Sequence, residues 1–328
     1  MTQQLGRILS GMRPTGRFHL GNYLGAVRNW VDLQSSYEAF YCIVDLHALT
    51  TVSDASSFNQ DIWEMAFDLI AAGIDERSAL FVQSQVPEVP ELHLLLSMVT
   101  PLSWLQRVPT FKEKVREQPD NVNYGLLGYP VLQTADILIY RADRVPVGKD
   151  QLAHLELARE IARRFNSLYG ASTLPEPEAL LTDSPVILGL DGQNKMSKSL
   201  NNHIEFYGDA ASTRKRVMQM VTDVKRTYLT QPGHPEQCNV CQLHKVFSPN
   251  WRELWDGCRE AKIGCGEKKA ILADNIIAYT EPYRAKRDSL DQRQVAAILE
   301  SGAERARAVA KATIGEVRQA VGIWRPAP

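Results

Sequence analysis

A glycine-rich loop near the start of the chain contains residue types that suit phosphate binding. Residues 8–33 read as a buried strand, a loop with Gly11, Gly16 and Gly21, and an amphipathic helix. Glycine allows the backbone to approach a ligand closely, and the N–H groups that begin a helix favour an anion. The stretch thus predicts a phosphate above Gly21 and Asn22. It matches neither the dinucleotide fingerprint nor the phosphate-loop pattern, and a strand-to-helix turn also uses glycine without any ligand.

Three further polar side chains lie in informative surroundings. Lys198 belongs to a glycine-flanked basic segment, which is either a solvated loop or a flexible loop that closes on phosphate groups. Asp136 is the one carboxylate of the apolar helical run 129–140. A buried carboxylate needs a partner, so Asp136 forms either a structural salt bridge or a hydrogen bond with a donor such as an indole N–H. His47 follows a predicted strand, where it either lines a ligand site or bonds to the backbone.

Four of the five cysteines, Cys238, Cys241, Cys258 and Cys265, lie in one short segment. In a reducing compartment such a group binds metal more often than it forms disulfides. Cys238 and Cys241 have the spacing of a metal knuckle, whereas the six residues between Cys258 and Cys265 do not fit a zinc ribbon. Iron–sulfur, zinc and unligated thiols remain open. Cys42, alone in an apolar strand, is predicted to be a small core residue.

A scaffold for these residues is predicted from alternating strands and helices, which indicate an α/β fold with a doubly wound parallel sheet over residues 1–200. Residues 201–301 contain helical patterns and no convincing strand, so they predict a second, all-helical domain. The last helix, in 302–328, is expected to pack back on the first domain. The strands are predicted at 39–44, 79–82, 144–147 and 186–188, with a loop at 175–185; later helices are predicted at 211–220, 242–258, 268–290 and 302–321.

Composition limits the class of protein. The 328 residues are 44% hydrophobic with a net charge of −1, so a nucleic acid would have to meet a local basic face. The chain has neither a run of eighteen apolar residues nor the apolar start of a signal peptide, so we expect a cytoplasmic protein without a membrane partner. The apolar helical segment 87–128 is either ordinary core or the surface of a homodimer.

Two motifs, in this order, carry a family resemblance. His19-Leu20-Gly21-Asn22 resembles the His-Ile-Gly-His motif of the class I aminoacyl-tRNA synthetases, and Lys195-Met196-Ser197-Lys198-Ser199 is identical to their KMSKS motif. The stretches S-G-M-R-P-T-G, D-L-H-A-L-T-T, Y-P-V-L-Q-T-A-D-I-L-I-Y, V-P-V-G-K-D-Q and H-L-E-L-A-R-E-I-A-R-R-F-N resemble the bacterial tryptophanyl-tRNA synthetases in particular.

The resemblance implies a reaction and its site. L-tryptophan would be activated by ATP, with Mg²⁺, to tryptophanyl-adenylate and pyrophosphate, and then transferred to the 3′-terminal ribose of tRNA(Trp). The helical domain would bind the anticodon. By the same resemblance the catalytic residues are His19, Lys195 and Lys198; the ATP site holds Arg13, Pro14, Thr15, Gly21, Asn22, Gly148, Lys149, Asp150, Val186, Lys195, Met196, Ser197, Lys198 and Ser199; and the tryptophan site holds Asp136, Tyr129, Gln151, Gly11 and His47.

This chain departs from the family at two of these positions. Lys149 replaces a usual glutamate, which puts a side-chain role there in doubt, and Arg13 replaces a frequent glutamine, so it could contact phosphate instead. The rival functions are a tyrosyl-tRNA synthetase and a relative that binds nucleotide or tRNA without charging it. The basic residues of the last helices offer tRNA contacts, though most are expected to be solvated faces: Lys268, Lys269, Arg284, Lys286, Arg287, Arg293, Arg305, Arg307 and Lys311.

The resemblance also bears on the cysteines. A subgroup of these synthetases carries a four-iron [4Fe-4S] cluster held by four cysteines, three of which correspond to Cys238, Cys258 and Cys265. The fourth, expected just after Cys265, is missing, and Cys241 is the candidate substitute because such a cluster takes four thiolates. The resemblance therefore implies a structural cluster near the tRNA-binding helices.

Overall fold

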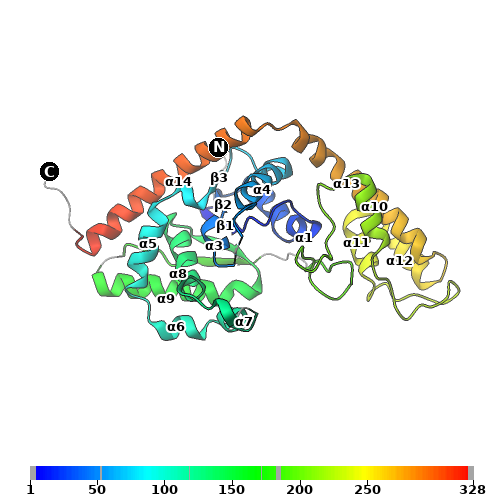
Figure 1. The fold of residues 1–328 in the computed structure, drawn as a ribbon, viewed down its shortest axis with the longest axis horizontal. Helices are drawn as coiled ribbons and strands as arrows, with labels where there is room; N and C mark the ends of the chain where they lie inside the picture. The colour runs from blue at the N-terminus through cyan, green and yellow to red at the C-terminus, as the bar shows by residue number, and fades with distance from the viewer. Residues whose placement is uncertain (1–4, 52–53, 118, 171, 182–185, 324–328) are drawn as a thin grey trace.

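The computed structural model describes residues 5–51, 54–117, 119–170, 172–181 and 186–323. Within them, a five-stranded parallel sheet has the order β3-β2-β1-β4-β5 (Figure 1). This order reverses beside β1, and ligands of open α/β sheets bind at the carboxyl ends of strands next to such a reversal. The predicted doubly wound α/β fold is therefore confirmed. The strands are β1 (Arg7–Met12), β2 (Glu38–Ile43), β3 (Ala79–Val82), β4 (Arg144–Val147) and β5 (Glu178–Leu181).

The last strand of the sheet differs from the prediction. β5 falls inside the segment 175–185 that was expected to be a loop, and residues 186–188 do not form the expected strand. Leu188 instead makes one antiparallel bridge with Lys195. The pattern misled because β5 is a short edge strand of partly exposed residues, without the buried apolar run of an inner parallel strand.

Helices cover both faces of the sheet. Successive residues of a strand point to opposite faces, so each strand packs against helices on both sides. Ile8 and Tyr41 pack toward α2 and α4, whereas Leu9 and Phe40 pack toward α5, α8 and α9. The helices of this region are α1 (Leu20–Asn22), α2 (Arg28–Leu33), α3 (Asp45–Ala48), α4 (Phe58–Ala72), α5 (Glu88–Ser97), α6 (Leu102–Arg107), α7 (Pro109–Glu117), α8 (Tyr124–Ile139) and α9 (Leu152–Tyr169), with a π-helical segment, Tyr23–Val27, joining α1 to α2.

The later part of the chain forms a helical arm beside the sheet (Figure 1). The helix predicted at 242–258 is in fact two, because Pro249 between them lacks the N–H that a continuous helix needs. No helix in the described ranges is long and apolar enough to cross a membrane. The helices of this part are α10 (Ala210–Met218), α11 (Asn239–Phe247), α12 (Trp251–Arg259), α13 (Cys265–Ser289) and α14 (Gln292–Ala320).

The last helix, α14, returns to the sheet and lies along the edge strand β3 (Figure 1). Gly302 makes this close approach possible, because a Cβ there would lie 1.9 Å from the carbonyl oxygen of Leu80. A covered edge strand cannot pair with another chain. The domain division at residues 200 and 301 remains a prediction.

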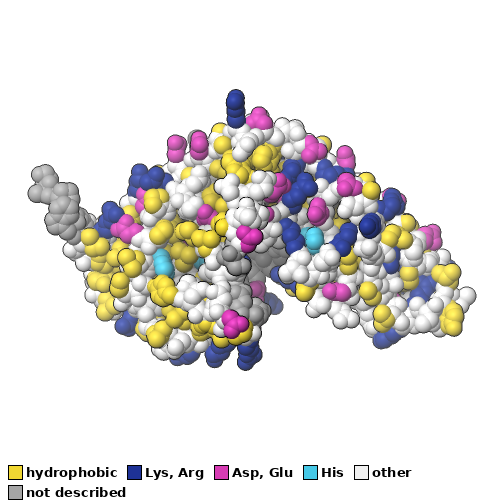
Figure 2. Space-filling model, viewed as in Figure 1, with side chains coloured by type: hydrophobic (Ala, Val, Ile, Leu, Met, Phe, Trp, Pro, Cys, Tyr) yellow, Lys and Arg dark blue, Asp and Glu magenta, His cyan; other side chains and the backbone are white. Residues whose placement is uncertain are grey.

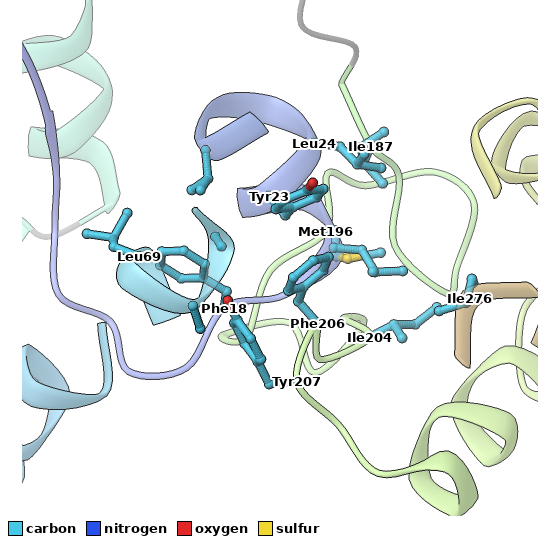
Figure 3. Packing of buried hydrophobic residues seen from close by; sticks show 14 of the residues in the cluster. Phe18, Tyr23, Leu24, Leu69, Ile187, Met196, Ile204, Phe206, Tyr207 and Ile276 are labelled. Carbon is cyan, nitrogen blue, oxygen red and sulfur yellow. The ribbon is translucent and has the colours of Figure 1, made fainter. Parts of the chain in front are cut away.

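A buried hydrophobic cluster continues from the sheet into the helical arm. Phe18 and Tyr23 from the N-terminal region meet Met196, Phe206 and Ile276 from later segments (Figure 3). The rings of Tyr23 and Phe206 stack with centroids 4.1 Å apart. Since apolar burial favours keeping these segments together, the KMSKS segment and α13 are packed against the N-terminal motif.

Candidate active site

The two family motifs lie side by side because the chain after the second pairs with the first. The Leu20 N–H donates to the Ile204 carbonyl at 2.9 Å, and the Phe206 N–H donates to the Phe18 carbonyl at 2.9 Å. His19 and Glu205 therefore face each other in an antiparallel bridge. Backbone hydrogen bonds thus bring together two segments that are about 180 residues apart.

His19 is the N-cap of α1 and is almost fully buried. Its Nδ1 accepts a hydrogen bond of 3.2 Å from the Asn22 N–H, and the Asn22 side chain accepts one of 3.0 Å from the His19 N–H. Burial, with the positive charges of Lys198 and Lys195 and the neighbouring His203, lowers the pKa of His19 to about 4. The ring is neutral near pH 7, and because Nδ1 accepts, Nε2 carries the proton and can donate to a ligand.

Gly21 lies between the two motifs. A Cβ at this position would be 3.0 Å from Nδ1 of His19 and 3.3 Å from Cβ of Met196. Met196 is buried in the cluster of Figure 3, and its N–H donates to the Ile187 carbonyl at 2.8 Å. A side chain at residue 21 would therefore push the KMSKS segment away from the histidine.

The KMSKS segment is a hairpin held by one asparagine, which the sequence analysis did not identify. The side chain of Asn202 accepts from the Ser197 N–H at 2.7 Å and donates to the carboxylate of Asp191 at 2.9 Å. Gly189 packs directly on this side chain, since a Cβ there would lie 2.2 Å from Cγ of Asn202. The polar run K-S-L-N-N gives no periodic signal that could have singled out Asn202.

The lysines of the hairpin lie in different surroundings. Lys198 is partly buried, and its Nζ donates to the Thr15 carbonyl at 2.5 Å, so it reaches back to the first glycine-rich loop. Burial lowers the pKa of Lys198, an effect opposed by the carboxylates of Asp68 and Asp61. Lys195 is exposed to solvent. The Ser197 and Ser199 hydroxyls are 2.8 Å apart at the tip.

A second polar group lies at the carboxyl ends of β2 and β3. The carboxylate of Asp136, on α8, is buried, with oxygens 2.8 and 2.9 Å from Nε2 of Gln83 and 2.9 Å from Nε2 of His47. Gln83 directly follows β3 and was not predicted. Both oxygens of the carboxylate thus have partners in this chain. Oδ1 is bonded to Gln83 only among the described residues, and its second lone pair can accept a further donor.

The remaining predicted residues of this region lie on α8 and in or beside the 3-10 turn Lys149–Gln151 that precedes α9. The Tyr129 hydroxyl is 2.9 Å from Nε2 of His154, and Nε2 of Gln151 donates to Asp150 at 2.8 Å. Gly148 leaves room for that carboxylate, because a Cβ would lie 2.6 Å from Oδ1 of Asp150. The side chain of Lys149 is exposed.

The start of the site is formed by the end of β1 and the loop after it. Arg13 donates to the Thr51 hydroxyl, and burial lowers its pKa. Gly11 fits beside Val44, where a Cβ would lie 2.7 Å from Cγ1 of that valine. Pro14 is buried, whereas Thr15 and Val186 are exposed.

Two of the four clustered cysteines, Cys241 and Cys258, contact the side chain of a lysine. Nζ of Lys268 donates to Sγ of Cys258 at 2.8 Å and to Sγ of Cys241 at 3.2 Å. A hydrogen bond from the Cys241 thiol, assisted by Lys268, lowers the pKa of Cys258 to about 5. Cys238 is buried, whereas Cys265, the first residue of α13, is partly exposed. Among the described residues, no group of three or more His, Cys, Asp and Glu side chains is arranged to hold a metal ion.

Several cations that the sequence offered for tRNA instead hold the fold together. Lys268 is buried, Arg287 pairs with the buried Asp68, and Arg305 donates to the Glu76 and Ser78 carbonyls. Among the described residues, the exposed members of the set are Lys286, Arg293, Arg305 and Lys311, whereas Lys269 and Arg307 are partly buried.

Comparisons with known proteins agree on one family. The family model described as "tRNA synthetases class I (W and Y)" matches residues 2–280. The tryptophan–tRNA ligase of Thermotoga maritima is 44% identical over 97% of this chain and 99% of its own, and that of Ralstonia nicotianae is 41% identical over 97% and 98%. The Campylobacter jejuni tryptophanyl-tRNA synthetase complexed with ADP and tryptophan superposes with a TM-score of 0.88 at 34% identity, over 97% of this chain and all of that one.

Proposed function

We propose that His19, Lys195 and Lys198 stabilise the transferring phosphates in this chain, which belongs to the class I tRNA synthetases for tryptophan and tyrosine and is a tryptophan–tRNA ligase. The observation that carries these roles is the pairing of the two motifs. The Leu20 and Phe206 hydrogen bonds hold the His19 segment against the chain that leaves the KMSKS hairpin. One ligand can therefore meet both motifs at once.

Activation joins the carboxylate of tryptophan to the α-phosphate of ATP and releases pyrophosphate. A carboxylate is already ionised near pH 7, so the reaction needs no general base, and its rate depends on positioning and charge stabilisation. Nε2 of His19 would donate to a phosphate oxygen without adding a charge, because the ring is neutral. Lys198 would exchange its hydrogen bond with the Thr15 carbonyl for one with the leaving pyrophosphate.

Mg²⁺ is expected with ATP, where it neutralises phosphate charge. Mg²⁺ is usually bound by substrate phosphates with few protein ligands, so we expect the phosphates to supply most of its coordination. The protein's own contribution is then the set of donors on the two motifs.

We place the indole of tryptophan near Asp136. A hydrogen bond from the indole N–H to a buried carboxylate is strong because water does not compete for it. His47 and Gln83 fix the carboxylate, so its orientation does not have to be set on binding. Tyr129, two turns away on the same face of α8, and Gln151 are proposed to meet the ammonium group of the substrate.

The test is pyrophosphate exchange into ATP with each of the twenty amino acids. Tryptophan should support exchange and tyrosine should give little. Exchange with tyrosine alone would favour a tyrosyl-tRNA synthetase. If no amino acid supports exchange, even when tRNA is added, the protein would be a relative that does not charge tRNA. The 41 and 44% identical ligases argue against both rivals.

We assign tRNA binding to the helical arm, residues 201–301, on the basis of one pocket and its charge. The pocket, of about 330 Å³, lies on α11 and α12 and is lined by Lys245, Trp251, Arg252, Trp255 and Asp256. Nζ of Lys245 lies 4.3 Å from the Trp255 ring centre. Two indole faces beside cations suit an unpaired base and its phosphate. Lys and Arg side chains also gather beside the hollow between the sheet region and the arm (Figure 2).

A homodimer is proposed from exposed apolar side chains on α5, directly after it, and at the start of α6. Met98 is 70% exposed, Leu102 57% and Leu94 54%. Such residues within one segment are typical of a surface that another protein covers. Sedimentation of the wild type and of Met98→Glu tests this proposal, since a charge in a dimer contact should shift the protein toward the monomer. The cytoplasmic location also remains a prediction.

The iron–sulfur cluster implied by the resemblance does not fit these side chains. A cluster requires four thiolates directed at one centre. Here Nζ of Lys268 lies between Cys241 and Cys258, at 3.2 and 2.8 Å from their sulfurs. Cys265 is not a buried ligand that could complete a set of four thiolates, because its side chain is partly exposed at the start of α13.

A further inference from the structure

Lys268 is one of the most deeply buried side chains of the protein, with 1% of its surface exposed. It starts from the first turn of α13 and ends among sulfurs from two other segments: Cys241 belongs to α11 and Cys258 to α12. The ammonium group of a residue on α13 therefore contacts a side chain of α11 and one of α12.

The residues around Lys268 hold its backbone and enclose the end of its side chain. The Lys268 carbonyl lies 3.0 Å from Nε2 of the buried His244, and Nδ1 of that histidine lies 2.6 Å from the Ser248 hydroxyl. Gly233 closes the other side, because a Cβ there would lie 2.5 Å from Sγ of Cys258. Backbone and side-chain contacts thus fix both ends of the lysine, which a surface cation would not need.

Burial of an ammonium group is costly unless a negative or strongly accepting partner offsets the loss of water. Within the described residues, the acceptors that lie within hydrogen-bonding distance of Nζ are sulfurs. Sulfur is a weak acceptor as a thiol and a good one as a thiolate. An ammonium group between two cysteines thus has the charge arrangement of a thiolate site with an internal cation.

We propose that Lys268 is a built-in replacement for a metal ion: its ammonium group binds Cys241 and Cys258 and ties α11, α12 and α13 together, so that the cysteine cluster holds no iron or zinc. The ammonium group lies within hydrogen-bonding distance of two of the four sulfurs. A metal ion could enter only by displacing a buried cation that already has its partners.

The first experiment measures metal on the wild-type protein. Protein purified without oxygen, then incubated with ferrous iron and sulfide or with Zn²⁺ and desalted, should retain none of them above background. Titration with Co²⁺ should produce no thiolate-to-cobalt charge-transfer band. A stoichiometric metal or a charge-transfer band from wild-type protein would overturn the proposal.

The second experiment changes the lysine. Lys268→Cys removes the internal cation and supplies a further sulfur, so the variant should bind about one Co²⁺ or Zn²⁺ per chain with a thiolate charge-transfer band. The matched control is Lys269→Cys, at the neighbouring residue, whose Nζ donates to the Met218 carbonyl at 3.0 Å instead. This control should bind no metal. A folded Lys268→Cys variant that binds none would also overturn the proposal.

A third variant decides the matter if Lys268→Cys does not fold. Lys268→Met keeps most of the side-chain volume and removes the charge and the donors. It should melt at a lower temperature than the wild type, whereas Lys269→Met should not. A Lys268→Met protein with wild-type melting would show that the ammonium group does not hold the helices, and the proposal would fail. These readouts do not depend on the ligase activity.

Discussion

The side-chain amide of Asn239, the first residue of α11, donates a hydrogen bond of 2.8 Å to the carbonyl oxygen of Gly189 at the base of the KMSKS hairpin. Asn239 directly follows Cys238, and α11 also carries Cys241, a partner of Lys268. A side-chain amide of the helical arm is therefore bonded directly to the base of the KMSKS hairpin. A displacement of α11 would change the hydrogen bond to the Gly189 carbonyl.

Asn239→Ala should loosen the hairpin and lower kcat for tryptophan-dependent pyrophosphate exchange by roughly tenfold, the equivalent of one buried hydrogen bond. The tryptophan KM should change little, since Asp136 lies elsewhere. Gln242→Ala is the matched control, because Gln242 on the same helix donates to the Pro235 and Glu236 carbonyls instead. Equal losses in both variants would indicate a general disturbance of α11.

Lys198→Ala tests the phosphate role of the hairpin. Removing a donor to developing charge should lower kcat for activation by roughly a hundredfold to a thousandfold. Tryptophan affinity, measured by equilibrium binding without ATP, should stay near the wild-type value. Lys215→Ala, at an exposed lysine of α10, should leave both quantities unchanged. A parallel loss of tryptophan binding would mean that the variant disturbs the fold of the site.

Asp136→Asn tests the indole contact while keeping the shape of the side chain. Loss of the charged acceptor should cost about 3 kcal/mol in kcat/KM for tryptophan. The temperature of unfolding should also fall, because His47 and Gln83 both bond to this carboxylate. Asp32→Asn, on the exposed side of α2, serves as the control. Unchanged tryptophan kinetics with reduced stability would assign Asp136 a purely structural role.

His19 should make stability depend on pH in a defined direction. Its pKa is lowered from 6.5 to about 4 in the folded protein, so between these values the unfolded chain binds a proton that the folded chain does not. This contribution to stability is complete above pH 6.5 and is lost as the pH falls toward 4. Asn at residue 19 keeps an N-cap acceptor and does not titrate.

Denaturant unfolding of the wild type and of His19→Asn at pH 7.5 and pH 5 measures this effect. The wild type should lose more free energy of unfolding than the variant on going to pH 5. Other histidines whose pKa is lowered, such as His244, contribute equally to both proteins and cancel in the comparison. The same loss in both proteins would show that His19 remains free to take up a proton in the folded state.

The fold class could be predicted because it depends on the spacing of apolar residues and on the order of strands and helices along the chain. Both can be read from the sequence. Alternating apolar runs and helical patterns predicted the parallel sheet. The prediction was wrong at β5 and at the helix that Pro249 divides. Pro249 divides a helical pattern whose apolar spacing continues across it. β5 is short and partly exposed, so it lacks the hydrophobic signal of an inner strand.

The supporting residues of the site could not be predicted from sequence. Asn202, Gln83 and Asn239 are ordinary amides whose partners lie in other segments, and no spacing rule connects an amide to a distant carbonyl or carboxylate. Lys268 misled in the opposite direction. A lysine at the start of a charged helix is normally solvated, and only the folded chain places it among sulfurs.

Trp255 provides the test of the tRNA surface. Its ring has the Lys245 ammonium group 4.3 Å from its centre, and the Trp251 ring lies 6.0 Å away and nearly perpendicular. If an unpaired base of tRNA stacks here, Trp255→Ala should cost about 1–3 kcal/mol of tRNA binding and raise the KM for tRNA in aminoacylation accordingly. Pyrophosphate exchange, which needs no tRNA, should remain at the wild-type rate.

The control for this prediction is Tyr228→Ala, an aromatic residue of the same arm that is 69% exposed and lies outside the pocket. It should leave the KM for tRNA unchanged. The affinity of the wild type for tRNA should fall steeply as the salt concentration rises. Lys245→Ala should make the slope of log affinity against log salt shallower by about the amount that one phosphate contact contributes, since each contact releases counterions. If Trp255→Ala charges tRNA with wild-type KM, the indole pair stabilises α12 only, and the base-binding surface of the arm must lie elsewhere.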